Sequence, residues 1–123
     1  MLSLSDYQNV ITEEFSNLHI EKQPKNLYEP IDYILSLGGK RIRPVLTLMA
    51  ADIFEGDYKK AISAAKAVEM FHNFSLVHDD IMDDAPLRRG NETVHEKWNL
   101  NTGILSGDAM LILAYQYFEN YEP

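Results

Sequence analysis

Apolar residues recur at every third or fourth position along much of the 123-residue chain, and this spacing predicts helices rather than strands. The first helix should precede Pro24, with an apolar face made by Leu4, Tyr7, Val10, Ile11, Phe15 and Leu18. A second helix is expected from Pro24 to the Gly38-Gly39 pair, where a left-handed cap costs little. A third is expected from Pro44 to about Phe54, because proline suits a first helical turn.

The middle of the chain predicts one long helix, from Tyr58 to about Asp84. This segment contains no Pro or Gly and is rich in alanine, a strong helix former. Pro86 disfavours helical geometry at the residue before it, so the helix should end close to the acidic residues there. Beyond this helix, we expect a loop over 88–90, a helical piece over 93–98 and a last helix over 103–119 capped by Thr102.

No segment shows the alternation of a strand, so the predicted fold class is all-α, a helical bundle forming a single domain over residues 1–123. The 19 acidic and 11 basic residues give a net charge of −8, which disfavours nucleic acid as a partner. The absence of cysteine excludes disulfides and thiolate chemistry. No apolar run approaches the roughly 20 residues of a membrane span, and no secretory signal is recognised, so we expect a cytoplasmic protein.

Four carboxylates lie close together at the end of the predicted long helix: Asp79, Asp80, Asp83 and Asp84. Like charges one turn apart repel, and negative charge near a helix C-terminus opposes the helix dipole. A solvated acidic helix end is one interpretation. The alternative is a site for a hard cation such as Mg²⁺, which keeps several waters and uses one or two carboxylates plus the phosphate oxygens of a substrate.

The basic residues are concentrated in two short segments, which hold Lys40, Arg41 and Arg43 in one and Arg88 and Arg89 in the other. Guanidinium groups form paired hydrogen bonds with phosphate oxygens, so both segments are candidate diphosphate clamps. A helix cap for the first segment and an Arg to Asp salt bridge for the second are the alternatives. Together with the acidic cluster, the two segments indicate a metal-bound diphosphate beside a second, metal-free anion.

Three stretches carry a family resemblance: GGKRIRP at 38–44, FHNFSLVHDDIMDDAPLRRG at 71–90 and ILSGDAML at 104–111. They resemble the trans-isoprenyl diphosphate synthases, or polyprenyl synthetases, in particular the farnesyl and geranylgeranyl diphosphate synthases. The resemblance implies the helical bundle of the isoprenoid synthases. It also implies a magnesium-dependent prenyltransferase that condenses an allylic prenyl diphosphate with isopentenyl diphosphate.

The resemblance also assigns roles to individual residues. Asp79, Asp80 and Asp83 would hold Mg²⁺ on the allylic diphosphate, with Arg88 gripping that diphosphate. Family members are more than twice this long and carry a second aspartate-rich motif, which is not recognised in this sequence. The chain therefore resembles an N-terminal portion that should lack full activity by itself. The resemblance also implies a homodimer. The residues matched to isopentenyl diphosphate binding are Lys40, Arg43, His72 and Arg89, although a buried core histidine remains an alternative for His72.

Two residues before the acidic cluster are candidates for controlling product length. Ser75 lies four residues before Asp79, on nearly the same helical face one turn deeper, where a growing prenyl chain would pass. Phe74 could partly close that passage, although an aromatic residue that fills the core is an equally ordinary interpretation. In the family an aromatic residue at this position accompanies short products, so farnesyl or geranylgeranyl diphosphate is expected.

Other functions compete with this prediction. Two Glu-x-x-His patterns, Glu69 to His72 and Glu92 to His95, are typical of di-iron helical bundles. That hypothesis leaves the aspartates and the arginine pair without a role. A catalytically inactive helical subunit of a synthase complex is a further alternative. Class I terpene cyclases share a similar acidic motif, but the GGKRIRP stretch indicates a second diphosphate site, which cyclisation does not need.

Overall fold

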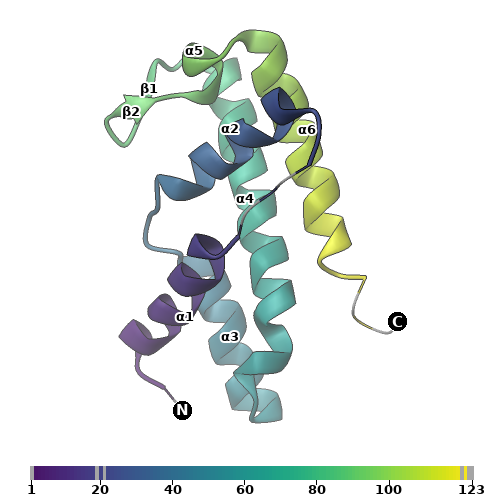
Figure 1. Ribbon diagram of the computed structural model, residues 1–123. Coiled ribbons are helices and arrows are strands. Elements are labelled where there is room, and N and C mark those ends of the chain that lie inside the picture. Colours follow the sequence, from purple (N-terminus) through teal and green to yellow (C-terminus); the bar gives the residue numbers. More distant parts are fainter. Residues whose placement is uncertain (1, 19, 21, 120, 122–123) are drawn as a thin grey trace.

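The computed structural model describes residues 2–18, 20, 22–119 and 121. Its central element is α4 (Ile62–Met82), and α6 (Leu100–Gln116) packs along it more extensively than any other element (Figure 1). Helices make up most of these residues, which confirms the all-α prediction. The other helices are α1 (Leu4–Ser16), α2 (Lys25–Ser36), α3 (Ile42–Glu55), the short α5 (Val94–Lys97) and a single 3₁₀ turn, η1 (Tyr58–Ala61).

The helix starts follow from local capping. Ser3 and Asp6 form a reciprocal capping box at the start of α1, in which each side chain accepts a hydrogen bond from the other residue's backbone N–H. At the start of α6 the prediction was wrong. Asn99, not Thr102, is the cap, because the Asn99 Oδ1 accepts from the Thr102 backbone N–H at 2.8 Å. The helix therefore begins at Leu100, three residues earlier than predicted.

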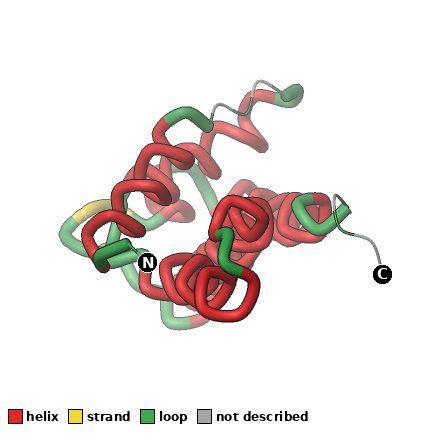
Figure 2. The backbone as a smooth tube through the Cα atoms, turned by 90° about the horizontal axis from the view of Figure 1, so that it is seen from below, coloured by secondary structure: helices red, strands yellow, loops and turns green. Residues whose placement is uncertain are grey.

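A two-stranded hairpin follows α4, formed by β1 (Leu87–Arg88) and β2 (Asn91–Glu92), and it appears as the yellow stretch at one edge in Figure 2. Its two-residue turn, Arg89-Gly90, has φ of 52° and 78°, as a type I′ turn requires. The prediction of no strand was wrong here, because strands of two residues are too short to show alternation.

The hairpin is anchored to the end of α4 through Thr93, which is fully buried. The Thr93 hydroxyl donates to the Ala85 carbonyl at 2.8 Å, and its backbone N–H donates to the Pro86 carbonyl at 3.1 Å. These bonds hold the chain where it turns away from the helix. The hairpin, including Arg88 and Arg89, is therefore fixed relative to the acidic end of α4.

The core lies between the helices, and its fully buried residues come from five of them: Tyr7, Ile11, Ile31, Leu48, Met70 and Met110. A close approach of α4 and α6 depends on Gly107. A Cβ atom at Gly107 would lie 2.4 Å from the His78 Nε2 atom. The two helices can pack this closely because α6 has no side chain at that point.

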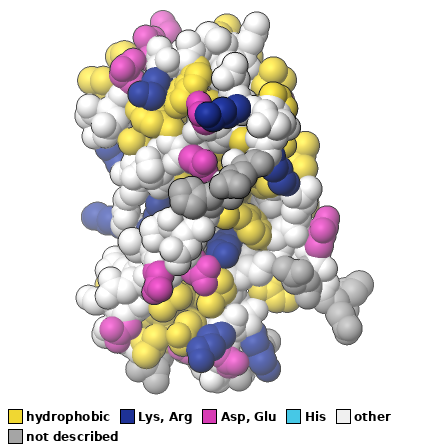
Figure 3. Space-filling model, viewed as in Figure 1, with side chains coloured by type: hydrophobic (Ala, Val, Ile, Leu, Met, Phe, Trp, Pro, Cys, Tyr) yellow, Lys and Arg dark blue, Asp and Glu magenta, His cyan; other side chains and the backbone are white. Residues whose placement is uncertain are grey.

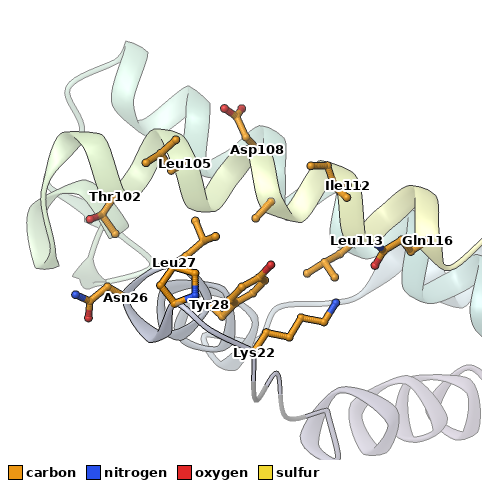
Figure 4. Close-up of a pocket in the computed structure, with 12 residues that line it drawn as sticks. Lys22, Asn26, Leu27, Tyr28, Thr102, Leu105, Asp108, Ile112, Leu113 and Gln116 are labelled. Carbon is orange, nitrogen blue, oxygen red and sulfur yellow. The ribbon is translucent and has the colours of Figure 1, made fainter.

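Apolar side chains also remain on the surface. The start of α2 and the outer side of α6 form a groove lined by Leu27, Leu105, Ile112 and Leu113, with Lys22 and Asp108 among its polar residues (Figure 4). On the face shown in Figure 3, basic side chains are scattered among acidic and hydrophobic ones. Among the described residues, no helix is both long enough and apolar enough to cross a membrane.

Candidate functional site

A bidentate ion pair between Asp80 and Arg88 joins the acidic end of α4 to the hairpin. The Arg88 Nε donates to Asp80 Oδ2 at 2.8 Å, and its Nη2 donates to Asp80 Oδ1 at 2.9 Å. The Asp80 side chain is 7% exposed and that of Arg88 is 23% exposed. The hydrogen bond to Asp80 raises the pKa of Arg88 above its usual range, although partial burial opposes this shift. Asp80 and Arg88 therefore form a single, tightly bonded ion pair in this structure.

Asp79 and Asp83 differ from Asp80, because both are exposed at the last turn of α4. They are one turn apart, and Asp83 closes the helix by donating its backbone N–H to the Asp79 carbonyl at 2.9 Å. Two exposed carboxylates at this spacing fit Mg²⁺, which binds through one or two carboxylates and completes its shell with water and phosphate oxygens. The donor set therefore suits the expected metal.

A second group of metal-ligating atoms lies next to this motif. Atoms of Asp84, His95 and Glu96 all lie within 4.8 Å of one another, and neither His95 ring nitrogen has a hydrogen-bond partner. Asp84 and Glu96 are exposed. Among the described residues this is the group of three whose ligating atoms lie within 4.8 Å of one another, so the carboxylates of Asp79, Asp80 and Asp83 are spread farther apart.

The basic loop and the hairpin meet over a shared cavity. Its wall includes the side chains of Lys40, Arg43, His72 and Arg89, the four residues predicted to bind isopentenyl diphosphate. They come from three parts of the chain: the α2–α3 loop with the start of α3, the middle of α4, and the hairpin turn. An Arg89 guanidinium N–H donates to the Gly38 carbonyl, which joins the hairpin to the loop. The structure thus brings these four residues together.

His72 and Arg43 are in direct contact inside this cavity. The Arg43 Nη1 lies 3.3 Å from His72 Nε2, so the guanidinium donates to an imidazole nitrogen that carries no proton. Burial lowers the pKa of His72, and the positive charge of Arg43 lowers it further, while Glu69 opposes the shift. These surroundings therefore favour the neutral form of His72. It faces the cavity rather than serving as a core histidine.

Arg41, which was included in the candidate diphosphate clamp, also lines this cavity, but its charged group is engaged by other partners. Its side chain is only 8% exposed and pairs with the buried carboxylate of Glu69 at 3.7 Å. Its Nη2 also donates to the Leu35 carbonyl at 2.6 Å. Burial lowers the pKa of Arg41, although Glu69 opposes that shift. The Arg41 guanidinium is thus held inside the protein by other partners.

An apolar groove continues from the basic cavity. Arg43 and His72 line both, so the charged cavity and the apolar groove adjoin at these two residues. The groove runs between α4 and α6, and its remaining lining residues are Ala67, Val68, Phe71, Ser75, Ala114, Tyr115 and Phe118. Such an arrangement suits an amphiphile with an anionic head and an apolar tail.

The two candidate product-length residues lie in different surroundings. Ser75 lines the apolar groove, and its hydroxyl donates to the His72 carbonyl at 2.6 Å. Phe74 is not among the lining residues. It packs against the core, with its ring centroid 5.4 Å from that of Phe71 and 4.8 Å from that of His78. A contribution of Phe74 to the groove would act through Phe71, which does line it.

Residues 24–123 match the family model described as polyprenyl synthetase. The chain belongs to the polyprenyl synthetase family. A geranylgeranyl pyrophosphate synthase from Geoglobus acetivorans is 44% identical over 113 residues, which cover 92% of this chain and 35% of that protein. A crystal structure of a geranylgeranyl pyrophosphate synthase, 56% identical, superposes with a TM-score of 0.94 over 99% of this chain and 37% of the other.

A more distant polyprenyl synthetase shares the same helical arrangement over this part of its chain. The heptaprenyl diphosphate synthase from Staphylococcus aureus is 27% identical and superposes with a TM-score of 0.88, over 99% of this chain and 39% of that one. This polyprenyl synthetase chain therefore spans a little over a third of the length of these relatives.

The di-iron hypothesis finds no support in the geometry of this polyprenyl synthetase. Glu69 is engaged by Arg41, and its Oε1 also accepts from the Asn73 amide at 2.9 Å. His72 contacts Arg43 instead of sharing a cluster with His95. Over the described ranges, the two Glu-x-x-His patterns are not brought into one ligand group.

Sequence reasoning missed Glu69 as a member of the basic cavity, which it lines together with His72. A signal was available. Glu69 precedes His72 by three residues, so both lie on one face of the long helix. A carboxylate on the helical face that carries a predicted anion-binding residue could have been recognised as the counter-charge of a nearby arginine.

Proposed function

We propose that this chain carries part of the active site of a short-chain isoprenyl diphosphate synthase, a prenyltransferase that joins an allylic diphosphate to isopentenyl diphosphate. One observation carries the proposal: the basic cavity and the apolar groove share Arg43 and His72. An isoprenyl diphosphate has a charged head and a hydrocarbon tail, and each of the two adjoining compartments matches one part of it. Family membership supports the same reaction class.

In this proposal the anions occupy two neighbouring places. Lys40, Arg43 and Arg89 bind the diphosphate of isopentenyl diphosphate without a metal, and His72 lies against the same anion. The second place lies at the acidic end of α4, about 10 Å from His72 along the helix axis because seven residues separate His72 from Asp79. Both substrates can then be held side by side, with their tails in the apolar region.

The acidic end would hold the allylic diphosphate through Mg²⁺, with Asp79 and Asp83 as ligands and Asp80 as a third. When bound, Mg²⁺ supplies Lewis-acid stabilisation to the departing diphosphate. Arg88 would contribute a guanidinium to the same leaving group, and this requires it to exchange one or both of its bonds to Asp80. As the allylic carbon–oxygen bond breaks, diphosphate would leave and an allylic cation would remain. The double bond of isopentenyl diphosphate would then attack this cation, and the proton lost afterwards would pass to the released diphosphate, so no protein nucleophile is needed.

Asp79→Asn tests the metal-dependent part of this proposal. Asp79 is exposed, so the substitution should leave the helical fold intact while weakening magnesium-dependent binding of an unreactive allylic thiolodiphosphate by at least about tenfold. Isothermal titration with and without Mg²⁺ measures this change. Glu13→Gln, an exposed carboxylate on α1, is the matched control and should bind like the parent chain. A parent chain whose binding is indifferent to Mg²⁺ would favour the inactive-subunit alternative.

Product length is proposed to depend on the α4 residues before the acidic cluster. In a complete synthase that carries this chain, Ser75→Phe should fill the groove and shorten the main product, whereas Phe74→Ala should remove packing behind Phe71 and lengthen it. Val10→Ala on α1 is a control for a general packing loss. Chromatography of the prenyl products measures both changes, and an unaltered product in Phe74→Ala would remove Phe74 from the role.

The homodimer and the cytoplasmic location stay predictions. The exposed apolar residues of α6, which include Leu105, Ile112 and Tyr115, support burial against a second subunit in the complete synthase. Sedimentation of a complete synthase as a monomer at micromolar concentration would contradict the homodimer. Subcellular fractionation would decide the location.

A further inference from the structure

A buried ion pair lies directly behind the basic loop. Arg41, the last residue before α3, reaches back to Glu69 on α4, and their side chains are 8% and 6% exposed. The two charges lie 3.7 Å apart, between the Arg41 Nη1 and the Glu69 Oε1. The cost of removing two charges from water is high and is recovered only when the pair makes further favourable contacts. Both Arg41 and Glu69 make such further contacts.

The Arg41 side chain makes two further contacts in addition to its ion pair with α4. Its Nη2 donates to the Leu35 carbonyl near the end of α2, and its guanidinium carbon lies 4.9 Å from the centre of the Phe15 ring on α1. Its own backbone has a φ of 55°, in the left-handed region that side chains other than glycine rarely adopt. A single side chain therefore joins α1, α2 and α4 to the residue directly before α3.

Glu69 is held equally firmly. Its Oε1 accepts from the Asn73 Nδ2 at 2.9 Å, and the same Asn73 amide lies 2.9 Å from the Glu69 carbonyl one turn back along α4. Glu69 is also the acidic residue among the described residues that line the basic cavity. By simple electrostatics a carboxylate in that wall should weaken anion binding. A Glu69 carboxylate in this wall is therefore compatible with anion binding only if it makes a favourable contribution larger than this repulsion.

We propose that Arg41 and Glu69 form a positioning pair. Both residues line the cavity, but their charged groups are paired with each other, and the pair acts by setting the place of Lys40 and Arg43 in the anion site. Lys40 directly precedes Arg41, and Arg43 follows it in the first turn of α3. Fixing Arg41 against α4 therefore fixes both neighbours relative to His72, which lies on that same helix. This inference rests on the proposed diphosphate site and adds the residues that hold its shape.

The charge of Glu69 makes the test decisive, because two explanations predict opposite signs. If Glu69 acts only through its field, Glu69→Gln removes negative charge from an anion site and should tighten the binding of inorganic pyrophosphate. If Glu69 positions Arg41, the same substitution releases the loop and should weaken that binding by about tenfold, the size of effect expected when one hydrogen bond to a charged group is lost. Isothermal titration of the chain with pyrophosphate in the absence of Mg²⁺ gives the answer.

Arg41→Lys provides an independent arm. It keeps the positive charge but cannot reach Leu35, Phe15 and Glu69 with one planar fork, so pyrophosphate binding should weaken by a similar factor. Glu29→Gln breaks an exposed ion pair with Lys25 on α2 and is the matched control, which should bind like the parent. Circular dichroism checks that each variant is folded, and if Glu69→Gln is not, Arg41→Lys decides the question.

The outcomes separate the two proposals. A parent chain that fails to bind pyrophosphate contradicts the proposed diphosphate site. A parent that binds, together with a folded Glu69→Gln that binds equally well or more tightly, overturns the positioning role and leaves the site intact. An Arg41→Lys variant that binds pyrophosphate with parental affinity also overturns the positioning role and leaves the site intact. Weaker binding in both variants, with Glu29→Gln unchanged, supports the positioning pair.

Discussion

Asp80→Asn is expected to lower the free energy of unfolding by about 2–3 kcal/mol, while Asp79→Asn leaves it nearly unchanged. Asp80 is largely buried and satisfies Arg88 through two short hydrogen bonds, so its loss leaves a partly buried guanidinium with a neutral and poorly matched partner. Breaking a fully buried pair costs about 3–5 kcal/mol. We reduce that figure because the Arg88 side chain is 23% exposed and can reach water.

The contrast with Asp79 follows from exposure. Asp79 has no ion-pair partner among the described residues and repels its acidic neighbours near the C-terminus of α4. Its removal therefore relieves a repulsion of a few tenths of a kcal/mol. Urea unfolding of the two variants, followed by circular dichroism, measures the difference. Equal stability of Asp80→Asn and the parent would show that the Asp80–Arg88 pair contributes no net stability.

The two substitutions also divide the acidic motif by function. Asp79→Asn should weaken magnesium-dependent ligand binding without changing the free energy of unfolding. Asp80→Asn should weaken that binding and also lower the free energy of unfolding. Asp80→Asn also releases Arg88, and through it the hairpin that carries Arg89 into the basic cavity. Metal-free pyrophosphate binding should therefore weaken in Asp80→Asn and remain parental in Asp79→Asn. One residue of the motif thus links the two anion sites.

Much of the fold could be predicted from local sequence signals. The three- and four-residue spacing of large apolar side chains predicted α1, and the buried face observed there is made by Tyr7, Ile11 and Phe15. The absence of Pro and Gly predicted a long helix, which the structure shows as η1 followed by α4. These signals succeed because helix formation depends on neighbouring residues and on one buried face.

The hairpin and its role could not be predicted in the same way. Its strands contain two residues each, so the period-two pattern has no length in which to appear. The available clue was Gly90, which follows Arg89 in a turn where both residues have positive φ. The orientation of Arg88 toward Asp80 and of Arg89 toward Gly38 depends on that turn, and therefore on tertiary structure.

The candidate site shows a similar division. The charged residue types and their spacing predicted two anion-binding segments, and the structure places Lys40, Arg43, His72 and Arg89 around one cavity. Charge and spacing alone could not separate Arg41 from Arg43, since both are arginines in one basic segment, although the family resemblance matched only Arg43 to isopentenyl diphosphate binding. Only the fold shows that one guanidinium is buried against Glu69 and the other faces His72. Burial is a property of the packed chain, which local sequence does not encode.

Gly39→Ala is expected to weaken metal-free pyrophosphate binding by about tenfold, because it places a methyl group where Arg89 must lie. A Cβ atom at Gly39 would be 2.1 Å from the Arg89 Nη1 and 2.7 Å from its Cζ. The Arg89 side chain would have to leave the loop and give up its hydrogen bond to the Gly38 carbonyl. A displaced Arg89 no longer completes the ring of basic groups around the cavity.

Gly38→Ala distinguishes this steric effect from backbone strain. Gly38 and Gly39 both have positive φ, 76° and 132°, so alanine is strained at either position by about 1 kcal/mol or more. At Gly38, however, no atom lies within 4 Å of the added Cβ. Isothermal titration should therefore show near-parental affinity for Gly38→Ala and weak binding for Gly39→Ala. Equal affinities in the two variants would mean that Arg89 contributes nothing to the anion site, because only Gly39→Ala displaces it.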